Sequence, residues 1–206
     1  MTRAADALAA LVFPQGCHVC GRAVLRRADG VACAACWSDP LVTPLYGGRA
    51  GGDRCERCGA PGSGACIACA PDGLAAVRSV GGYTGALRAA LLDLKLRPRP
   101  CRRLLDLLAE TYRREPALHG ADLVVPVPLH ARRLASRGHN QAFALAEAVS
   151  RAARVDLVPT ALARARHTAR RRAGVDRQGR ERAVRDAFRA AGRLVAGRRA
   201  LVVDDL

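Results

Sequence analysis

Apolar residues from about residue 74 onward fall into two patterns, one of helical spacing and one of short strand-like runs. Leucines recur at helical spacing over residues 85–112, in one group before Pro98 and a second group after Pro100. Because proline removes a backbone donor and clashes with the preceding turn, the pattern predicts two helices separated at these prolines. Residues 141–153 show the same spacing and predict a third helix.

The short apolar runs predict strands. They cover residues 77–83, residues 122–127 and residues 200–203. Pro126 and Pro128 mark the end of the second of these strands. Strands that alternate with helices favour a parallel sheet with helices on its faces. We therefore expect an α/β fold in this part of the chain.

Residues 1–73 differ from the rest, because they are rich in Gly, Pro and Asp and have no sustained helical period. A chain of 206 residues suits one large domain or two small ones. We predict a cysteine-rich module over residues 1–73 and an α/β domain over residues 74–206. Aromatic residues make up only 3% of the chain, so Ala, Leu and Val must supply most of the core.

Charge separates the same two parts. The formal net charge is +16, but residues 1–73 hold seven basic and six acidic residues, so nearly all the excess lies after them. This distribution predicts anionic partners for the second part, either phosphorylated small molecules or nucleic acid. No apolar run reaches the roughly 20 residues of a transmembrane helix. The start carries Arg3 and Asp6 and is a poor secretory signal, so we expect a cytoplasmic protein.

Eight of the nine cysteines form four C-x-x-C pairs, and this is the clearest chemical signal in the sequence. Two such turns supply the four thiolates that a structural zinc ion prefers, so four pairs predict up to two zinc ions. Sequential pairing gives one set of Cys17, Cys20, Cys33 and Cys36 and a second set of Cys55, Cys58, Cys66 and Cys69. Interleaved pairing stays open. Disulfides fit poorly with a chain that lacks a secretion signal, and iron–sulfur binding is a further alternative.

The other residues near these pairs have simpler interpretations. His18 lies inside the first pair, but the thiols already suffice as ligands. We expect Trp37 to pack within the module and Cys101 to be an ordinary small residue. Because the module is nearly neutral, we favour a structural or docking role for it.

Asp204 and Asp205 follow the last predicted strand. Two adjacent carboxylates at the carboxyl end of a strand can bind vicinal hydroxyls or a magnesium ion. Acids also end many strands as solvated loop residues or helix caps, so the pair alone is a weak signal.

Several motifs, in this order, resemble those of the ComF family, which joins a double zinc ribbon to a phosphoribosyltransferase domain. They are Leu11-Val12-Phe13-Pro14 before the first C-x-x-C-G, Tyr83-Thr84-Gly85 leading to Leu94-Lys95-Leu96, Val125-Pro126-Val127-Pro128-Leu129-His130, Arg137-Gly138-His139-Asn140-Gln141-Ala142, Arg166-His167-Thr168, Ala173-Gly174-Val175, Ala187-Phe188, and the strand into Asp204-Asp205. The resemblance spans nearly the whole chain. Its most specific part is the valine–proline motif followed by the arginine–glycine and asparagine–glutamine motif.

The resemblance implies a type I phosphoribosyltransferase fold that binds phosphoribosyl pyrophosphate (PRPP) with Mg²⁺ above the strand ends. By position, Asp204 and Asp205 would hold the ribose hydroxyls as the catalytic pair, and Lys95, Arg133 and Arg137 are candidate phosphate contacts. Arginine suits that role because its paired donors match phosphate oxygens. We expect Asn140 and Gln141 either to cap the turn or to meet substrate.

Two features depart from the family pattern. Relatives continue after the acidic pair with a Thr-Thr-Gly-x-Thr-like loop that cradles the 5′-phosphate, whereas this sequence stops at Leu206. We therefore expect a fragment of a longer protein, with an incomplete phosphoribosyltransferase-like sheet that is inactive as it stands. In addition, residues 160–199 contain thirteen arginines and three acids.

The sequence thus supports two functions. One is a PRPP- and Mg²⁺-binding, phosphoribosyltransferase-like protein associated with DNA uptake in natural competence. The other is a zinc-bearing factor without catalysis that contacts single-stranded DNA or competence proteins. Because the basic segment has only Phe188 for base stacking, any DNA contact would be made to phosphates and would be sensitive to salt.

Overall fold

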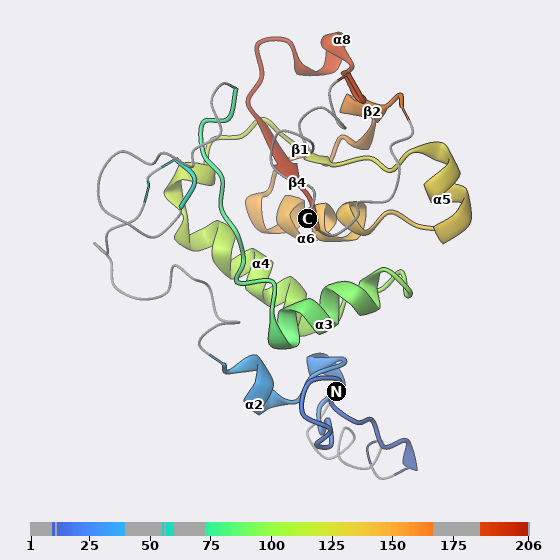
Figure 1. Cartoon of the computed structure of the whole chain (residues 1–206). Helices are drawn as coiled ribbons and strands as arrows, with labels where there is room; N and C mark the ends of the chain where they lie inside the picture. The colour runs from blue at the N-terminus through green and yellow to red at the C-terminus, as the bar shows by residue number, and fades with distance from the viewer. Residues whose placement is uncertain are drawn as a thin grey trace. The chain divides into compact units, whose positions relative to one another are not determined.

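The computed structural model describes residue 10 and residues 12–39, 55, 57–59, 73–166 and 186–205. The chain divides into two compact units, Met1–His119 and Gly120–Leu206, each with its own helices (Figure 1). The boundary that we predict after residue 73 lies inside the first unit and stays a prediction. Within the described residues, no helix is long and apolar enough to cross a membrane.

The first unit begins with a short antiparallel pairing in which Gly16 bridges Ala23. A 3-10 turn, η1 (Arg27–Asp29), and the one-turn helix α2 (Ala34–Trp37) follow. The side chains of Val24, Ala32 and Trp37 are buried and form a small core around the first cysteines. This core places a cysteine cluster at the N-terminal end of the chain.

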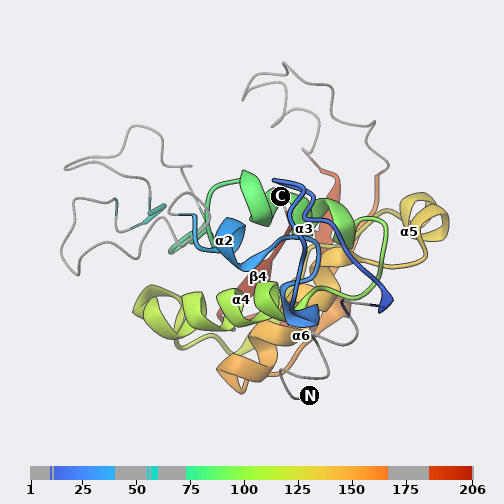
Figure 2. The ribbon, with the colours of Figure 1, turned by 90° about the horizontal axis from the view of Figure 1, so that it is seen from below.

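Helices α3 (Gly85–Leu94) and α4 (Arg102–Arg114) are the two longest helices among the described residues of the first unit. They are separate ribbons in Figures 1 and 2, and the break between them contains Pro98 and Pro100, as the sequence predicts. Each helix buries a face built largely of leucine, Leu87, Leu91 and Leu94 in α3 and Leu104 and Leu107 in α4. Contacts join α2 to α3 and η1 to α4, and a further 3-10 turn, η2 (Pro116–Leu118), packs on α4.

The strand predicted over residues 77–83 is wrong, since these residues form no strand in the structure. The backbone N–H of Val77 donates instead to the carbonyl of Arg57, 2.6 Å away. Ser79 Oγ turns back to the carbonyl of Gly81 at 2.9 Å. Isolated loop contacts of this kind use the backbone groups that a sheet ladder would need.

The second unit is built on a small parallel sheet. Strand β1 (Leu123–Pro126) pairs in parallel with β4 (Ala200–Val203), in a register that sets Pro126 opposite Val203. Leu157 bridges Val124 in parallel on the other side of β1. The predicted strands over residues 122–127 and 200–203 are confirmed, and so is the parallel direction of the sheet.

Helices and turns cover both faces of β1. The long helix α6 (Gln141–Ala153), predicted from the sequence with these bounds, packs on β1 and β4 (Figure 1). On the opposite face, Leu123 and Val125 pack with Ala161 of η3 (Pro159–Ala161) and with Leu194 of α8 (Gly192–Val195). This arrangement explains why β1 reads as a continuous apolar run, because it is buried along its whole length.

Two further elements complete the described part of the second unit. A short antiparallel pair joins β2 (Leu162–Arg164) to β3 (Phe188–Ala190). The short helix α5 (Ala131–Arg137) links β1 to α6 and buries none of its residues. Residues 167–185, which include much of the predicted basic segment, lie outside the described residues.

Candidate metal centre and the carboxyl edge of the sheet

The first four cysteines come together as the sequential pairing predicts. The sulfur atoms of Cys17, Cys20, Cys33 and Cys36 all lie within 4.8 Å of one another. The sulfurs of Cys17 and Cys36 are 3.8 Å apart, and those of Cys20 and Cys33 are 3.7 Å apart. The four residues therefore form a site that can hold a metal ion.

The spacing of the sulfurs fits one four-coordinate ion. A tetrahedron with metal–sulfur bonds of about 2.3 Å has sulfur–sulfur edges of about 3.8 Å. The two measured separations match this edge. A cluster of several iron atoms would hold its thiolates farther apart, because inorganic sulfide separates the irons. The donor set is thus suited to a single thiophilic ion.

The first C-x-x-C turn is shaped by its glycine. Gly21 has a φ of 74°, in the left-handed region that glycine adopts most readily, and its N–H donates to the carbonyl of Cys17 at 2.9 Å. This closes the turn and directs backbone amides at sulfur. The N–H groups of Val19 and Cys33 donate to Cys17 Sγ at 3.4 and 3.3 Å.

These amides set the ionisation of the cluster. Burial opposes ionisation of the Cys17 thiol, but the N–H groups of Cys33, Cys20 and Val19 outweigh it and lower the pKa of Cys17 to about 6. Burial, followed by hydrogen bonds within the cluster, raises the pKa of Cys36 to about 12. The site thus has one thiolate formed in advance, and metal binding must displace the proton of Cys36.

Trp37 packs inside the module, as predicted. Its side chain is 1% exposed, and its Nε1–H donates to the carbonyl of Asp29 at 2.8 Å. The indole of Trp37, the residue after Cys36, thus satisfies the buried backbone acceptor of Asp29. His18 is exposed and does not belong to the four-residue set. Burial raises the pKa of the Cys101 thiol, which keeps that cysteine protonated and unreactive at neutral pH.

The second cysteine set is described only in part. Cys66 and Cys69 lie outside the described residues. Cys55 and Cys58 form a turn like the first, in which Gly59 has a φ of 71° and donates its N–H to the carbonyl of Cys55 at 2.8 Å. The N–H of Cys58 donates to Cys55 Sγ at 3.5 Å. The described residues of the second C-x-x-C-G sequence therefore share the left-handed glycine and the closing hydrogen bond of the first.

In the second unit, the acidic pair lies where β4 ends. Because β1 and β4 are parallel, both carboxyl ends meet at one edge of the sheet, which we call the carboxyl edge (residues 127–130 and 204–205). The N–H of Val127 donates to the carbonyl of Val203 at 2.9 Å and extends the ladder to this edge. Asp204 Oδ1 accepts the N–H of Asp205 at 2.8 Å, which turns the chain after the strand.

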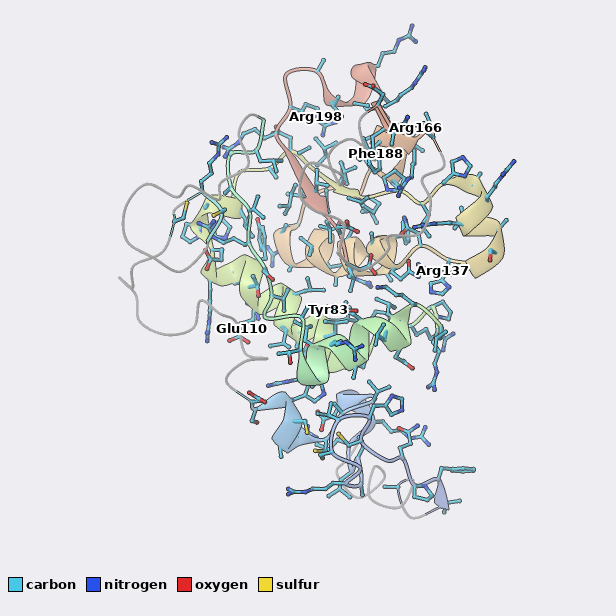
Figure 3. All side chains as sticks on the ribbon, viewed as in Figure 1. Tyr83, Glu110, Arg137, Arg166, Phe188 and Arg198 are labelled. Atoms are coloured by element: carbon cyan, nitrogen blue, oxygen red, sulfur yellow. The ribbon has the colours of Figure 1, made fainter. Side chains whose placement is uncertain are left out.

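The motif between β1 and α6 has a clear local structure. His130 begins α5, and its Nδ1 accepts the N–H of Arg132 at 3.2 Å. Arg133 lies in the first turn of α5 and Arg137 at its end, where Figure 3 labels it. Gly138 ends the helix in the left-handed region, with a φ of 77°. The sequence therefore brings basic side chains directly after the loop at the carboxyl edge.

Asn140 has the capping role that was one of the two expectations for it. Its Oδ1 accepts the N–H of Ala142 at 3.1 Å, and its Nδ2 donates to the carbonyl of Val127, also at 3.1 Å. The side chain thus fixes the start of α6 against the loop after β1. Gln141 is fully buried beside it.

The remaining predicted contact, Lys95, lies in the first unit, directly after α3. Sequence reasoning did not anticipate the buried ion pair between Arg78 and Glu115 in the same unit, with Nε and Oε2 2.7 Å apart. The two residues are 37 positions apart and lie in no recognisable motif, so no sequence signal could have identified the pair.

Comparison with protein-family models, with curated proteins and with solved structures gave no match for this chain.

Proposed function

We propose that the chain is a zinc-stabilised, phosphoribosyltransferase-like protein of the ComF type whose second unit binds PRPP with Mg²⁺. The observation that carries this proposal is the parallel register of β1 and β4, which sets Pro126 opposite Val203. The acidic pair and the loop into α5 therefore share one edge of the sheet. In open parallel sheets, ligands bind outside the carboxyl ends of the strands.

The chemistry of this edge suits a phosphorylated ribose. Asp204 and Asp205 can accept hydrogen bonds from vicinal ribose hydroxyls, and their carboxylates also suit Mg²⁺. Arg133 and Arg137 supply paired donors for phosphate oxygens. A bound Mg²⁺ would neutralise charge on the pyrophosphate group of PRPP. Lys95 remains a candidate phosphate contact by the family resemblance alone.

We propose Zn²⁺ as the ion of the first cysteine cluster. Its four thiol donors and edges of 3.7 and 3.8 Å support this choice, since zinc prefers four sulfur ligands in tetrahedral geometry. With no position left for a substrate, the ion has a structural role. The matching turn at Cys55 and Cys58 supports a second zinc ion, completed by Cys66 and Cys69.

Binding of PRPP is tested by thermal denaturation of the zinc-loaded protein with PRPP and MgCl₂. We expect the melting temperature to rise with PRPP concentration, because a ligand that binds only the folded state stabilises it. The double substitution Asp204→Asn and Asp205→Asn should remove the rise. Asp106→Asn is the matched control, since Asp106 is an exposed acid of α4 in the other unit. A wild-type protein that shows no rise, or a double variant that keeps it, would rule out this function.

A second candidate is binding of single-stranded DNA through phosphates, and one observation favours it. Helix α5 buries no residue and carries Arg132, Arg133 and Arg137, while residues 123–146 contain no acid. The logarithm of the affinity for a fluorescent single-stranded oligonucleotide should fall linearly with the logarithm of the salt concentration. Arg132→Gln should reduce the magnitude of this slope by about one unit, since one fewer counterion is released. Binding that is independent of salt would exclude this candidate.

A further inference from the structure

Asn140 joins the start of α6 to the loop that follows β1. Its Oδ1 accepts the N–H of Ala142 at 3.1 Å, and its Nδ2 donates to the carbonyl of Val127 at 3.1 Å. The reverse orientation of this amide would set oxygen against oxygen and N–H against N–H, so the two contacts fix which end faces Val127. One half-buried side chain thus caps α6 and donates to the loop.

Val127 is in turn held to β4. Its N–H donates to the carbonyl of Val203 at 2.9 Å. Pro126 and Pro128 flank it, and proline has no backbone N–H. Val127 therefore carries the single backbone donor of this proline-flanked stretch, and that donor closes the parallel ladder at the carboxyl edge. Both backbone groups of Val127 are thus fixed, one by β4 and one by Asn140.

The same contacts lead to the acidic pair. Asp204 directly follows Val203, so the bond to the Val203 carbonyl fixes the orientation of the peptide group that joins them. Asp204 Oδ1 then accepts the N–H of Asp205 at 2.8 Å. A series of hydrogen bonds therefore runs from Asn140 through Val127 to the point where the acidic pair begins.

We infer that Asn140 is a positioning residue for the ligand of the carboxyl edge, where it acts through Val127 to fix the acidic pair. This inference rests on the proposed binding of PRPP with Mg²⁺. Asparagine suits the role because one short, planar amide offers both an acceptor and a donor. Ser, Thr and Asp also cap helices well, but their side chains lack the amide donor that reaches Val127.

Two substitutions separate the cap from the donor. Asn140→Ser keeps a neutral acceptor for the N–H of Ala142, Asn140→Ala removes it, and neither keeps the donor to Val127. In titration calorimetry with MgCl₂, both should weaken PRPP binding by a similar factor, about 10- to 100-fold, as is typical of groups that orient the ligands of a metal. Asn140→Ala should also melt about 4 to 8 °C below Asn140→Ser without ligand, because it loses the cap.

Ser150→Ala is the matched control at the other end of α6. Ser150 Oγ donates to the carbonyl of Val155 at 2.6 Å, so this variant also loses a bond between α6 and a neighbouring loop. It should lower the melting temperature and leave PRPP affinity unchanged. Amide hydrogen exchange is a second measurement that needs no ligand. The N–H of Val127 should exchange faster in Asn140→Ser than in the wild type or in Ser150→Ala.

The outcomes separate this inference from the function on which it rests. A wild type that binds no PRPP would refute the proposed function and the effect on affinity with it, whereas exchange at Val127 still decides whether Asn140 holds the edge. Wild-type binding together with unchanged PRPP affinity in Asn140→Ser, or unchanged exchange at Val127, would refute the positioning role alone. An equal loss of affinity in Ser150→Ala would also refute it, since the general stability of α6 would then explain the effect.

Discussion

Gly30 lies directly against Cys101, in a contact that joins the first cysteine cluster to the start of α4. A Cβ atom built on Gly30 would be 2.4 Å from Cys101 Cβ and 3.1 Å from its Sγ. Gly30 also has a φ of 66°, in the left-handed region. The position therefore requires glycine for two reasons, one of space and one of backbone conformation.

Gly30→Ala should destabilise the first unit by about 2 to 4 kcal/mol, because overpacking and a left-handed alanine each add a cost. Unfolding in urea, followed by Trp37 fluorescence, measures this loss. Gly197→Ala is the matched control, since Gly197 has a φ of 70° but no atom within 4 Å of the added Cβ. Gly197→Ala should lower the stability of the second unit by only the cost of a left-handed alanine, about 1 to 2 kcal/mol, as measured by unfolding of that unit.

Cys101→Gly should partly rescue Gly30→Ala, whereas Cys101→Ala should not. The atom in conflict is Cβ of Cys101, which alanine retains and glycine removes. A double-mutant cycle isolates this coupling from the separate cost of each change. Equal rescue by the alanine and glycine replacements would show that the sulfur, and not Cβ, limits the space at Gly30, and no rescue by either would show that Cys101 does not limit it.

The stability of the metal-free protein should depend on pH through the ionisation of Cys17. Its folded pKa of about 6 lies below the ordinary value of 9.0, so the unfolded state binds the proton more tightly. The stabilisation from this group is then full above pH 9 and is lost as the pH falls toward 6. Thermal denaturation of chelated, reduced protein should show this loss, and Cys17→Ser should remove it. A wild type and variant with parallel pH profiles would contradict the shift.

Cys36 should have the opposite effect. Its raised pKa, about 12, stabilises the metal-free fold fully below pH 9 and progressively less as the pH rises toward 12. The difference in stability between the wild type and Cys36→Ser should therefore shrink from pH 9 upward. Thiolate absorbance near 240 nm, recorded on the folded metal-free protein, gives an independent measure of the same ionisation.

Metal removal should be visible at Trp37. Trp37 follows Cys36, its side chain is 1% exposed, and its indole N–H donates to the carbonyl of Asp29. Without an ion, the four thiols no longer hold the turns together, and water gains access to the ring. Addition of a chelator in the presence of a reductant should shift the emission to longer wavelength, and added Zn²⁺ should restore it. A spectrum unaffected by chelation would show that packing alone maintains the module.

The sequence predicted regular elements well where a local rule was sufficient. Prolines at 98 and 100 separate α3 from α4, and the apolar spacing over residues 141–153 gives the bounds of α6. C-x-x-C spacing predicted the tight turns, and sequential pairing, one of the arrangements that it left open, is the one that brings Cys17, Cys20, Cys33 and Cys36 together. Each of these predictions depends on contacts within a few residues or on strong ligand chemistry.

Contacts between distant residues were not predictable in the same way. Residues 77–83 have strand-like apolar positions at Val77, Val80 and Tyr83, but the N–H of Val77 donates to the carbonyl of Arg57, and these residues form no strand. Likewise, no sequence pattern predicts that Arg78 pairs with Glu115 or that Gly30 packs against Cys101. Such contacts depend on the packing of the whole unit, which a local pattern does not encode.

Asp122 gives a last test, at the join between β1 and β4. Its N–H donates to the carbonyl of Arg199 at 2.8 Å, and its Oδ2 accepts the N–H of Arg199 at 2.7 Å. The parallel ladder therefore begins with a side chain that satisfies a backbone amide. Asp122→Ala should destabilise the second unit by about 0.5 to 1.5 kcal/mol, because it removes the acceptor of that exposed amide.

Asp122→Asn separates the hydrogen bond from the charge. Asparagine keeps an oxygen at the same position, so it should retain most of the stability that alanine loses. Urea unfolding followed by far-UV circular dichroism measures both variants. If the two substitutions are equally destabilising, the negative charge of Asp122 matters more than the bond to Arg199. In that case added salt should reduce the stability of the wild type toward that of the variants, since salt screens an exposed charge but leaves a hydrogen bond largely intact.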